Sequence, residues 1–113
     1  MRLKQIEKMD CPFCPMFESS DATYLCITPL NPVVEGHKIY IPREHVRDFS
    51  DEPDVYGRLS EIVAENTFSN DFNIITSRGS DATQTVAHLH IHVVPRSAND
   101  GLHLPWTDQE KQS

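Results

Sequence analysis

The segment "AHLHIHVVPR", Ala87 to Arg96, places His88, His90 and His92 at every second position. Successive side chains of a β-strand alternate between its two faces, so this spacing predicts that the three imidazoles share one face. The apolar residues between them would share the opposite face: Leu89, Ile91 and Val93. The segment therefore predicts a strand with one face for a core and a second face rich in histidine.

Two kinds of chemistry fit a face of three histidines, and an unreactive polar surface is the simpler alternative. Histidines on a strand can bind a catalytic metal whose water becomes a nucleophile near neutral pH. Alternatively, one neutral imidazole attacks phosphorus and forms a covalent intermediate that water later releases. The second route requires an acceptor that fixes the ring's other nitrogen, and donors for the phosphoryl oxygens. The preceding loop offers such donors: Gly79, Ser80, Gln84 and Thr85.

Length and composition limit the class of protein. A chain of 113 residues is expected to form a single domain, 1–113, that buries about two-thirds of the surface of its unfolded form. The net charge of -7 argues against binding polymeric nucleic acid but allows a small anionic ligand. No apolar run is long enough to span a membrane, and the start, "MRLKQIEKMD", lacks the apolar core of a secretory signal. We therefore expect a cytoplasmic protein without a membrane partner.

Apolar patterning predicts one helix and four strands. The expected strands are the stretches 22–28, 37–42 and 71–76 and the histidine segment. The helix is expected in "SDEPDVYGRLSEIVAENTF", where Ser50 or Asp51 can cap the first turn and Pro53 is tolerated within it. Its apolar residues follow helical spacing: Val55, Leu59, Ile62 and Val63. One helix among strands joined by turns predicts an α+β fold with a largely antiparallel sheet.

Two of the three cysteines form "CPFC" near the start of the chain. The two-residue spacing of Cys11 and Cys14 lets both thiolates bind one tetrahedral zinc ion. A redox pair would instead need a strand before the motif, as in thioredoxin-like units, and none is expected there. We therefore favour a metal site over a redox pair or two free thiols. Cys26 lies in an apolar strand and is expected to be a small core residue.

Three further histidines lie outside the alternating segment. His37 and His45 flank the second expected strand, in "GHKIYIPREH", and strands can bring distant positions together. Both are therefore candidates for the same site as the alternating histidines. His103, in "GLHLPW", lacks such a neighbour and is expected to be structural.

Together these motifs resemble those of the histidine triad (HIT) superfamily. "HLHIHVV" is similar to the family signature of three histidines alternating with apolar residues. "PVVEGHKIYIPREHV", residues 32–46, resembles the family's G-H segment, and "GSDATQTVAH" resembles its approach to the triad. "CPFC" is similar to the cysteine pair of zinc-containing, bacterial-type members. The resemblance runs from about Cys11 to Arg96, most of the chain.

The resemblance implies a HIT-like fold, a mainly antiparallel sheet of about five strands with one main helix, and commonly a homodimer. Family chemistry is attack on the α-phosphate of a nucleotide, through a nucleotidyl-histidine that passes to water or another acceptor. His90, the middle histidine, would be the nucleophile, and His92 and His37 would orient and hydrogen-bond around the phosphate. Gln84 and Thr85 would contact the phosphate or the leaving group.

The resemblance also implies a structural zinc ion. In zinc-containing members the metal joins the cysteine pair to two histidines, and the ligands here would be Cys11, Cys14, His45 and His88. A metal held by two cysteines and two histidines has no open position, so the chemistry falls to His90 beside it. Residues 9–20 would form an N-terminal zinc knuckle, and residues 97–113 a C-terminal tail that contacts the site.

Three positions depart from the family pattern. Ser77 stands where the family often has Asn, and Thr83 where it often has Gly, which predicts an altered phosphate loop. Pro29 stands at the spacing of the family's ribose-binding Asp or Asn, with Asn31 nearby. The expected substrate-binding residues are Thr85, Gly79, Ser77 and Asn31.

The sequence therefore predicts a nucleotide hydrolase or transferase that cleaves a nucleoside monophosphate conjugate. Phosphoramidates are the first substrate class and dinucleoside polyphosphates the second. Two alternatives stay open: a nucleotide-binding module with weak turnover, and a metal-dependent hydrolase that uses the triad as ligands. The expected partners are a small-molecule nucleotide and a second copy of the chain.

Overall fold

The fold is that of a computed structural model, which describes residues 11–66 and 71–107. The strands are β1 (Tyr24–Ile27), β2 (Lys38–Pro42), β3 (Phe72–Ile75) and β4 (Ile91–Pro95). The helix α2 spans Pro53–Glu65, and two 3-10 turns, η1 and η2, span Cys14–Phe17 and Ser80–Ala82. Two residues of the expected zinc knuckle, 9 and 10, and the end of the expected tail, 108–113, lie outside the described residues.

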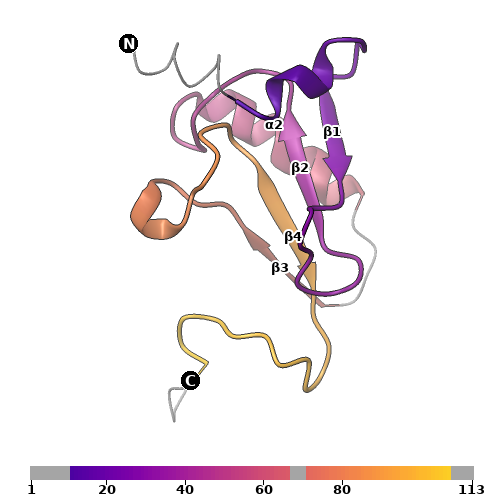
Figure 1. The fold of residues 1–113 in the computed structure, drawn as a ribbon, viewed down its shortest axis with the longest axis vertical. Coiled ribbons are helices and arrows are strands. Elements are labelled where there is room, and N and C mark those ends of the chain that lie inside the picture. The colour runs from indigo at the N-terminus through magenta and orange to yellow at the C-terminus, as the bar shows by residue number, and fades with distance from the viewer. Residues whose placement is uncertain (1–10, 67–70, 108–113) are drawn as a thin grey trace.

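The strands form one sheet in the order β1-β2-β4-β3, and every neighbouring pair is antiparallel (Figure 1). The α+β class with an antiparallel sheet is therefore confirmed, and the described residues contribute four strands where about five were expected. In the register of β4 with its neighbours, His92 lies opposite Ile39 of β2 and Ile75 of β3. This central position of β4 places the histidine segment in the middle of the sheet.

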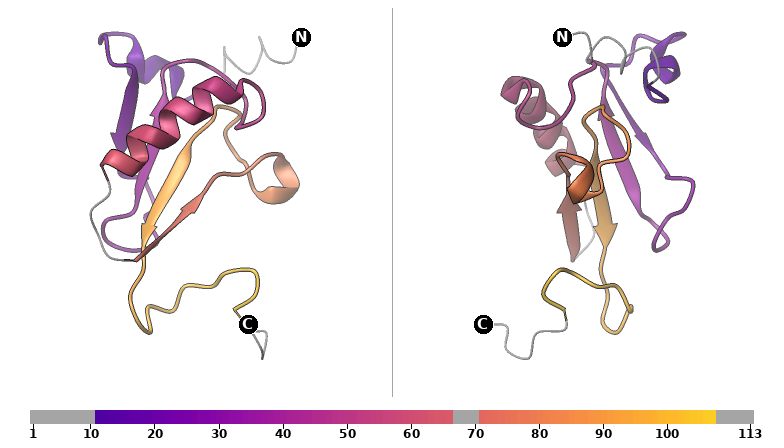
Figure 2. Two further views of the ribbon diagram at one scale, coloured as in Figure 1. Left: turned by 180° about the vertical axis from the view of Figure 1, so that it is seen from behind. Right: turned by 60° about the vertical axis from the view of Figure 1, so that its left-hand side comes forward.

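The helix α2 covers one face of the sheet (Figure 2). Pro53 occupies its first turn, as expected, because proline needs no N–H partner there. The cap, however, is Glu52 and not Ser50 or Asp51. Those two side chains bond within the preceding turn: the Ser50 hydroxyl donates to Asp48, and Asp51 accepts the N–H of Arg47.

Each face of the sheet has its own apolar cluster. Under α2, the helix residues Val55, Leu59 and Val63 pack with Leu89, Ile91 and Val93, so the apolar half of the histidine segment is in the core as expected. On the opposite face, a second cluster joins the N-terminal turn to β2: Cys11, Phe13, Phe17, Ile39 and Ile41. The histidines lie on this second face, beside the N-terminal turn.

Two expectations about local structure are wrong. Cys26 is exposed and not in the core. Its register partner is Tyr40, but β1 is an edge strand and α2 packs against β2. In addition, β4 begins at Ile91, so only His92 lies within it. The backbone of the residues before β4 makes isolated hydrogen bonds in place of a strand ladder. The Leu89 N–H donates to the Val46 carbonyl (2.7 Å), and the Thr76 hydroxyl donates to the His90 carbonyl (2.7 Å).

Among the described residues, no helix is both long and apolar enough to cross a membrane.

Candidate functional site

The ring of His90 lines a cavity and has one protonated and one unprotonated nitrogen. Its Nδ1 lies 2.7 Å from the carbonyl oxygen of His88, and a carbonyl can only accept, so Nδ1–H is the donor. In the neutral ring, Nε2 then carries no proton. Burial lowers the pKa of His90, which favours this neutral form. The fixed tautomer is the one that a nucleophilic imidazole requires.

His92 has the opposite tautomer because His37 determines it. The backbone N–H of Val33 donates to His37 Nδ1 (3.1 Å), so neutral His37 carries its proton on Nε2. That proton is donated to His92 Nδ1, 2.9 Å away, which leaves neutral His92 with its proton on Nε2. Burial is the main cause that lowers the pKa of His37 and lowers that of His92 to about 4. Both rings are therefore neutral at pH 7.

Two adjacent imidazoles thus carry complementary groups. The ring centroids of His90 and His92 are 5.2 Å apart, and both rings line one cavity of about 420 Å³. His90 offers an electron pair and His92 offers a proton, without either ring being charged. This is the arrangement needed to attack an electrophile and to donate to the atoms around it.

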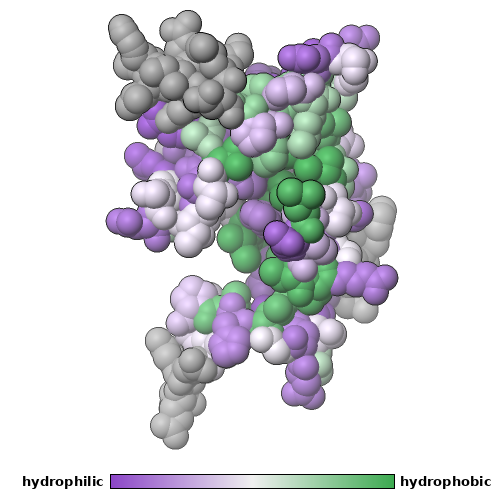
Figure 3. Space-filling view, viewed as in Figure 1, coloured by the Kyte–Doolittle hydropathy of each residue, from purple (hydrophilic) through white to green (hydrophobic). Residues whose placement is uncertain are grey.

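The cavity contains some, but not all, of the expected substrate-binding residues. It lies on the face that Figure 3 shows hollowed between the tail and the body above it. Its lining includes Ser77, Thr83 and Gln84 from the loop before the triad. Gly79 is outside the lining but donates its N–H to Gln84 Oε1 (2.9 Å), which orients that amide. Thr85 and Asn31 are exposed and are not among the described lining residues.

The C-terminal tail, which was expected to contact the site, supplies three lining residues that the sequence did not assign individually. Leu102, His103 and Leu104 face the same cavity as His90 and His92. His103 was expected to be structural because no motif surrounds it. The tail follows no helical or strand period, so nothing in its pattern indicates that it turns back toward β4.

Thr83 is the position at which the departure from the family pattern has a backbone consequence. Its φ is +66° and its ψ is +29°, in the left-handed region that penalises a side chain with a Cβ. Glycine adopts this conformation freely. The unusual threonine therefore strains the turn that follows η2 and borders the cavity.

We expect Thr83→Gly to stabilise the protein. The left-handed conformation costs a threonine about 1–2 kcal/mol, and glycine removes this cost. Glycine also makes the unfolded chain more flexible, which lowers stability by about 0.5–1 kcal/mol. The free energy of unfolding should therefore rise by about 0.5–1 kcal/mol. Urea unfolding measures it. The matched control is Ala82→Gly, inside η2, which has no positive φ and should destabilise. A Thr83→Gly protein less stable than the wild type would contradict the assignment of strain.

A second cluster brings four metal-ligand atoms together on the same face. Cys14 begins η1, and Cys11 lies just before it. Together with His45 and His88 they bring four ligand atoms within 4.8 Å of one another. The two Nδ1 atoms are 3.2 Å apart, and His88 Nδ1 is 3.3 Å from Cys11 Sγ and 3.7 Å from Cys14 Sγ. Cys14 Sγ is 3.2 Å from His45 Nδ1. These four residues could therefore hold a metal ion.

The spacing fits a tetrahedral ion. With metal–nitrogen bonds of about 2.0–2.1 Å and metal–sulfur bonds of about 2.3 Å, tetrahedral geometry separates two nitrogens by about 3.3 Å and nitrogen from sulfur by about 3.6 Å. The protonation of His88 also fits. Its Nε2–H donates to the Pro42 carbonyl (2.9 Å), so Nδ1 presents an electron pair to the cluster. Burial is the largest cause that lowers the pKa of His88, to about 4, and so keeps the ring neutral.

Phe13 connects the two groups of histidines. It lies between the two cysteines of "CPFC" and is buried. Its ring makes edge contacts with His88, at a centroid distance of 5.7 Å, and with His90, at 5.3 Å. Phe13 therefore links His88 of the potential metal site to the ring of His90.

Comparison with known proteins supports one family. A family model described as "HIT domain" matches residues 19–99. The chain is 29% identical over 109 residues to "Adenylylsulfatase HINT3" of Arabidopsis thaliana, an alignment that covers 82% of this chain but only 55% of that protein. It is 27% identical over 113 residues to "Adenosine 5'-monophosphoramidase HNT1" of Saccharomyces cerevisiae, covering 88% of this chain and 72% of that one.

Solved structures give the same result for the fold. A structure described as a "ZN-bound histidine triad family protein from Mycobacterium smegmatis" is 29% identical, with a TM-score of 0.70 over 85% of this chain and 81% of that one. A protein from Leishmania major reaches a TM-score of 0.74 at 24% identity, over 94% of this chain and 86% of that one, and is similar in fold alone.

Proposed function

The chain belongs to the HIT domain family, and from this premise we propose that it is a nucleotide hydrolase or transferase that acts at an α-phosphate through His90. The observation that carries the proposal is the pair of complementary tautomers. His90 Nδ1–H is bound to a carbonyl oxygen, and His92 Nδ1 accepts from His37. The sequence relatives named adenylylsulfatase and adenosine 5'-monophosphoramidase point to conjugates of adenosine monophosphate as substrates.

In the proposed first step, His90 Nε2 attacks the α-phosphorus. A phosphorus–nitrogen bond forms, and the bond from phosphorus to the leaving group breaks with its electron pair. The Nε2–H of His92 would donate a hydrogen bond to the leaving group, which takes its proton from solvent. Ser77 and backbone N–H groups of the loop before the triad would donate to the phosphoryl oxygens, where charge accumulates. Gln84 would hold this loop in place, because its Nε2 donates to the carbonyls of Arg47 and Val86 and its Oε1 accepts from Gly79.

In the second step, water replaces the histidine. It attacks phosphorus, the phosphorus–nitrogen bond breaks with its electron pair returning to His90 Nε2, and the proton of the water passes to solvent. The nucleoside monophosphate is released, and His92 keeps its Nε2 proton throughout. If an acceptor other than water enters, the same cycle gives a transferase.

We assign the four-residue cluster to a structural zinc ion that joins residues 11–20 to β2 and the start of the triad. A bound ion would fix the ring of His88 and, through Phe13, the ring of His90. Two cysteine and two histidine ligands leave no position for substrate, so the proposed steps fall to the histidines of the cavity. We also propose that the chain is one HIT-like domain and forms a homodimer, which light scattering would test.

The test is to trap the intermediate. We expect the protein to become nucleotidylated on His90 when it is mixed with adenosine 5'-phosphoramidate and quenched rapidly, as mapped by peptide mass spectrometry. Two other results would support the alternatives. AMP binding without turnover of any such conjugate would indicate a binding module. Activity that is lost reversibly on chelation, in protein that stays folded and forms no adduct, would indicate a catalytic metal.

A further inference from the structure

The C-terminal tail is part of the cavity, although it lies beyond the strand that carries the triad. After β4 the chain turns back beyond the sheet (Figures 1 and 2). Leu102, His103 and Leu104 line the same cavity as His90 and His92. Residues 97–107 contain no helix or strand. Something other than regular secondary structure must therefore hold this wall in place.

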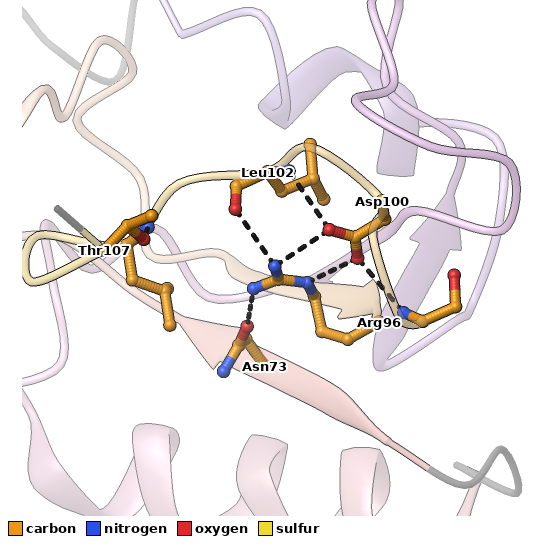
Figure 4. A network of polar contacts seen from close by, with 7 residues as sticks. Asn73, Arg96, Asp100, Leu102 and Thr107 are labelled. Atoms are coloured by element: carbon orange, nitrogen blue, oxygen red, sulfur yellow. Dashed lines mark hydrogen bonds and ion pairs between the residues drawn. The ribbon is translucent and has the colours of Figure 1, made fainter. Parts of the chain in front are cut away.

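Arg96 joins the end of β4 to both the tail and β3 (Figure 4). Its Nε and Nη2 donate to the two carboxylate oxygens of Asp100, at 2.8 and 3.0 Å, in a forked pair. Nη2 also donates to the Leu102 carbonyl (3.1 Å), and Nη1 donates to Asn73 Oδ1 of β3 (2.6 Å). One guanidinium thus links three segments of the chain.

Asp100 completes the closure from the tail side. Its carboxylate also accepts the backbone N–H groups of Ser97 and Leu102, each at 3.0 Å. These bonds, above all the one from Arg96, hold the pKa of Asp100 well below its usual range, so the carboxylate is ionised at neutral pH. The turn needs two left-handed residues, Asn99 (φ +61°) and Gly101 (φ +78°), which suit asparagine and glycine.

The charge of Arg96 is used inside the protein. Arg96 is the one lysine or arginine among the described lining residues, which would make it an obvious phosphate ligand. Four donated bonds to Asp100, Leu102 and Asn73, however, occupy most of the five N–H groups of a guanidinium. The side chain is also mostly covered, with 22% exposed. These contacts indicate that Arg96 holds the tail in place and does not bind an anion.

We propose that Arg96 and Asp100 are positioning residues, forming a clasp that holds residues 97–104 as a ligand-binding wall of the nucleotide cavity. The inference rests on the proposed function for the identity of the ligand. The bonds given for Arg96 and Asp100 reach neither His90 nor His92, so the clasp sets the affinity for the nucleotide and not the rate of attack at phosphorus.

The test compares Asp100→Ala and Asp100→Asn with the wild type. We expect Asp100→Ala to raise the Kd for AMP and the KM for adenosine 5'-phosphoramidate by about tenfold or more, while kcat falls by less than about threefold. Asp100→Asn keeps one acceptor oxygen and should lie between the two. Hydrogen exchange at the amides of Ser97 and Leu102 should accelerate in the same order, because both amides donate to Asp100.

The control is Arg58→Gln, which breaks the ion pair of Arg58 with Glu44 (2.6 Å) outside this cavity and should change neither Kd nor tail exchange. Faster tail exchange in Asp100→Ala with an unchanged Kd would contradict the claim that the tail binds the nucleotide. Unchanged tail exchange in Asp100→Ala would contradict the claim that Arg96 and Asp100 hold the tail in place. If the wild type binds AMP in a clasp-dependent way but turns over no conjugate, the proposed chemistry fails and this inference stands. If the wild type does not bind AMP, both fail.

Discussion

His90→Asn is expected to abolish hydrolysis of adenosine 5'-phosphoramidate, lowering kcat/KM by a factor on the order of 10⁴ or more. The electron pair on Nε2 is the only group in the proposed mechanism that forms a bond to phosphorus. An asparagine amide can still donate to the His88 carbonyl, as Nδ1–H does at 2.7 Å, so the surrounding chain should keep its position. Steady-state kinetics with a direct assay of the released nucleoside monophosphate measures the loss.

The fold and the metal content of His90→Asn should match those of the wild type, because His90 is not one of the four clustered ligand residues. Thermal unfolding and metal analysis check this. The adduct expected on His90 in the wild type should also disappear. A variant that keeps more than about one hundredth of wild-type activity would show that another group attacks phosphorus.

Cys11→Ser has the second large expected effect, and that effect is on stability. A structural zinc ion bound by the folded chain but not by the unfolded chain contributes its binding energy to folding, about 10 kcal/mol or more in small zinc domains. Cys11 is buried in the apolar cluster of Phe13, Phe17, Ile39 and Ile41, so the change also disturbs packing. We expect loss of zinc and a fall in Tm of more than about 10 °C.

The matched control is Cys26→Ser, which changes an exposed thiol on β1 outside the cluster. It should leave zinc content and Tm unchanged. The main effect of Cys11→Ser should be on stability, and the loss of activity per folded molecule should be small by comparison. The cluster supports the triad, but the proposed steps do not pass through it. Unchanged zinc content in Cys11→Ser would exclude the four-residue metal site.

Much of the local structure could be predicted from the sequence. The alternation of "HLHIHVV" placed Leu89, Ile91 and Val93 under α2, because the two-residue period of a strand is a local property. The spacing of Val55, Leu59 and Val63 identified the buried stripe of the helix for the same reason. Cys26 was misassigned because an apolar strand does not reveal whether it lies at the edge of a sheet, where one face stays open.

The tertiary structure decided what each histidine can do. Tautomers depend on hydrogen-bond partners far away in the chain: His92 on His37, and His88 on Pro42. Thr83 was known to depart from the family pattern, but only its φ of +66° shows that the cost lies in the backbone. The tail was expected to contact the site, but the sequence did not show how, since its position depends on the Arg96–Asp100 pair and on Asn73 of β3.

The sequence by itself determined the family and the α+β class and predicted the residues that we propose to carry the chemistry, because motifs and periodicity are properties of neighbours along the chain. The resemblance gave the three imidazoles different expected roles, and only the tertiary structure showed which nitrogen of each carries the proton. His88 presents an electron pair to two thiols, His90 carries one on a ring that lines the cavity, and His92 presents a proton beside it. A histidine has two nitrogens and one proton when neutral, and the partner that the fold supplies decides which nitrogen carries it.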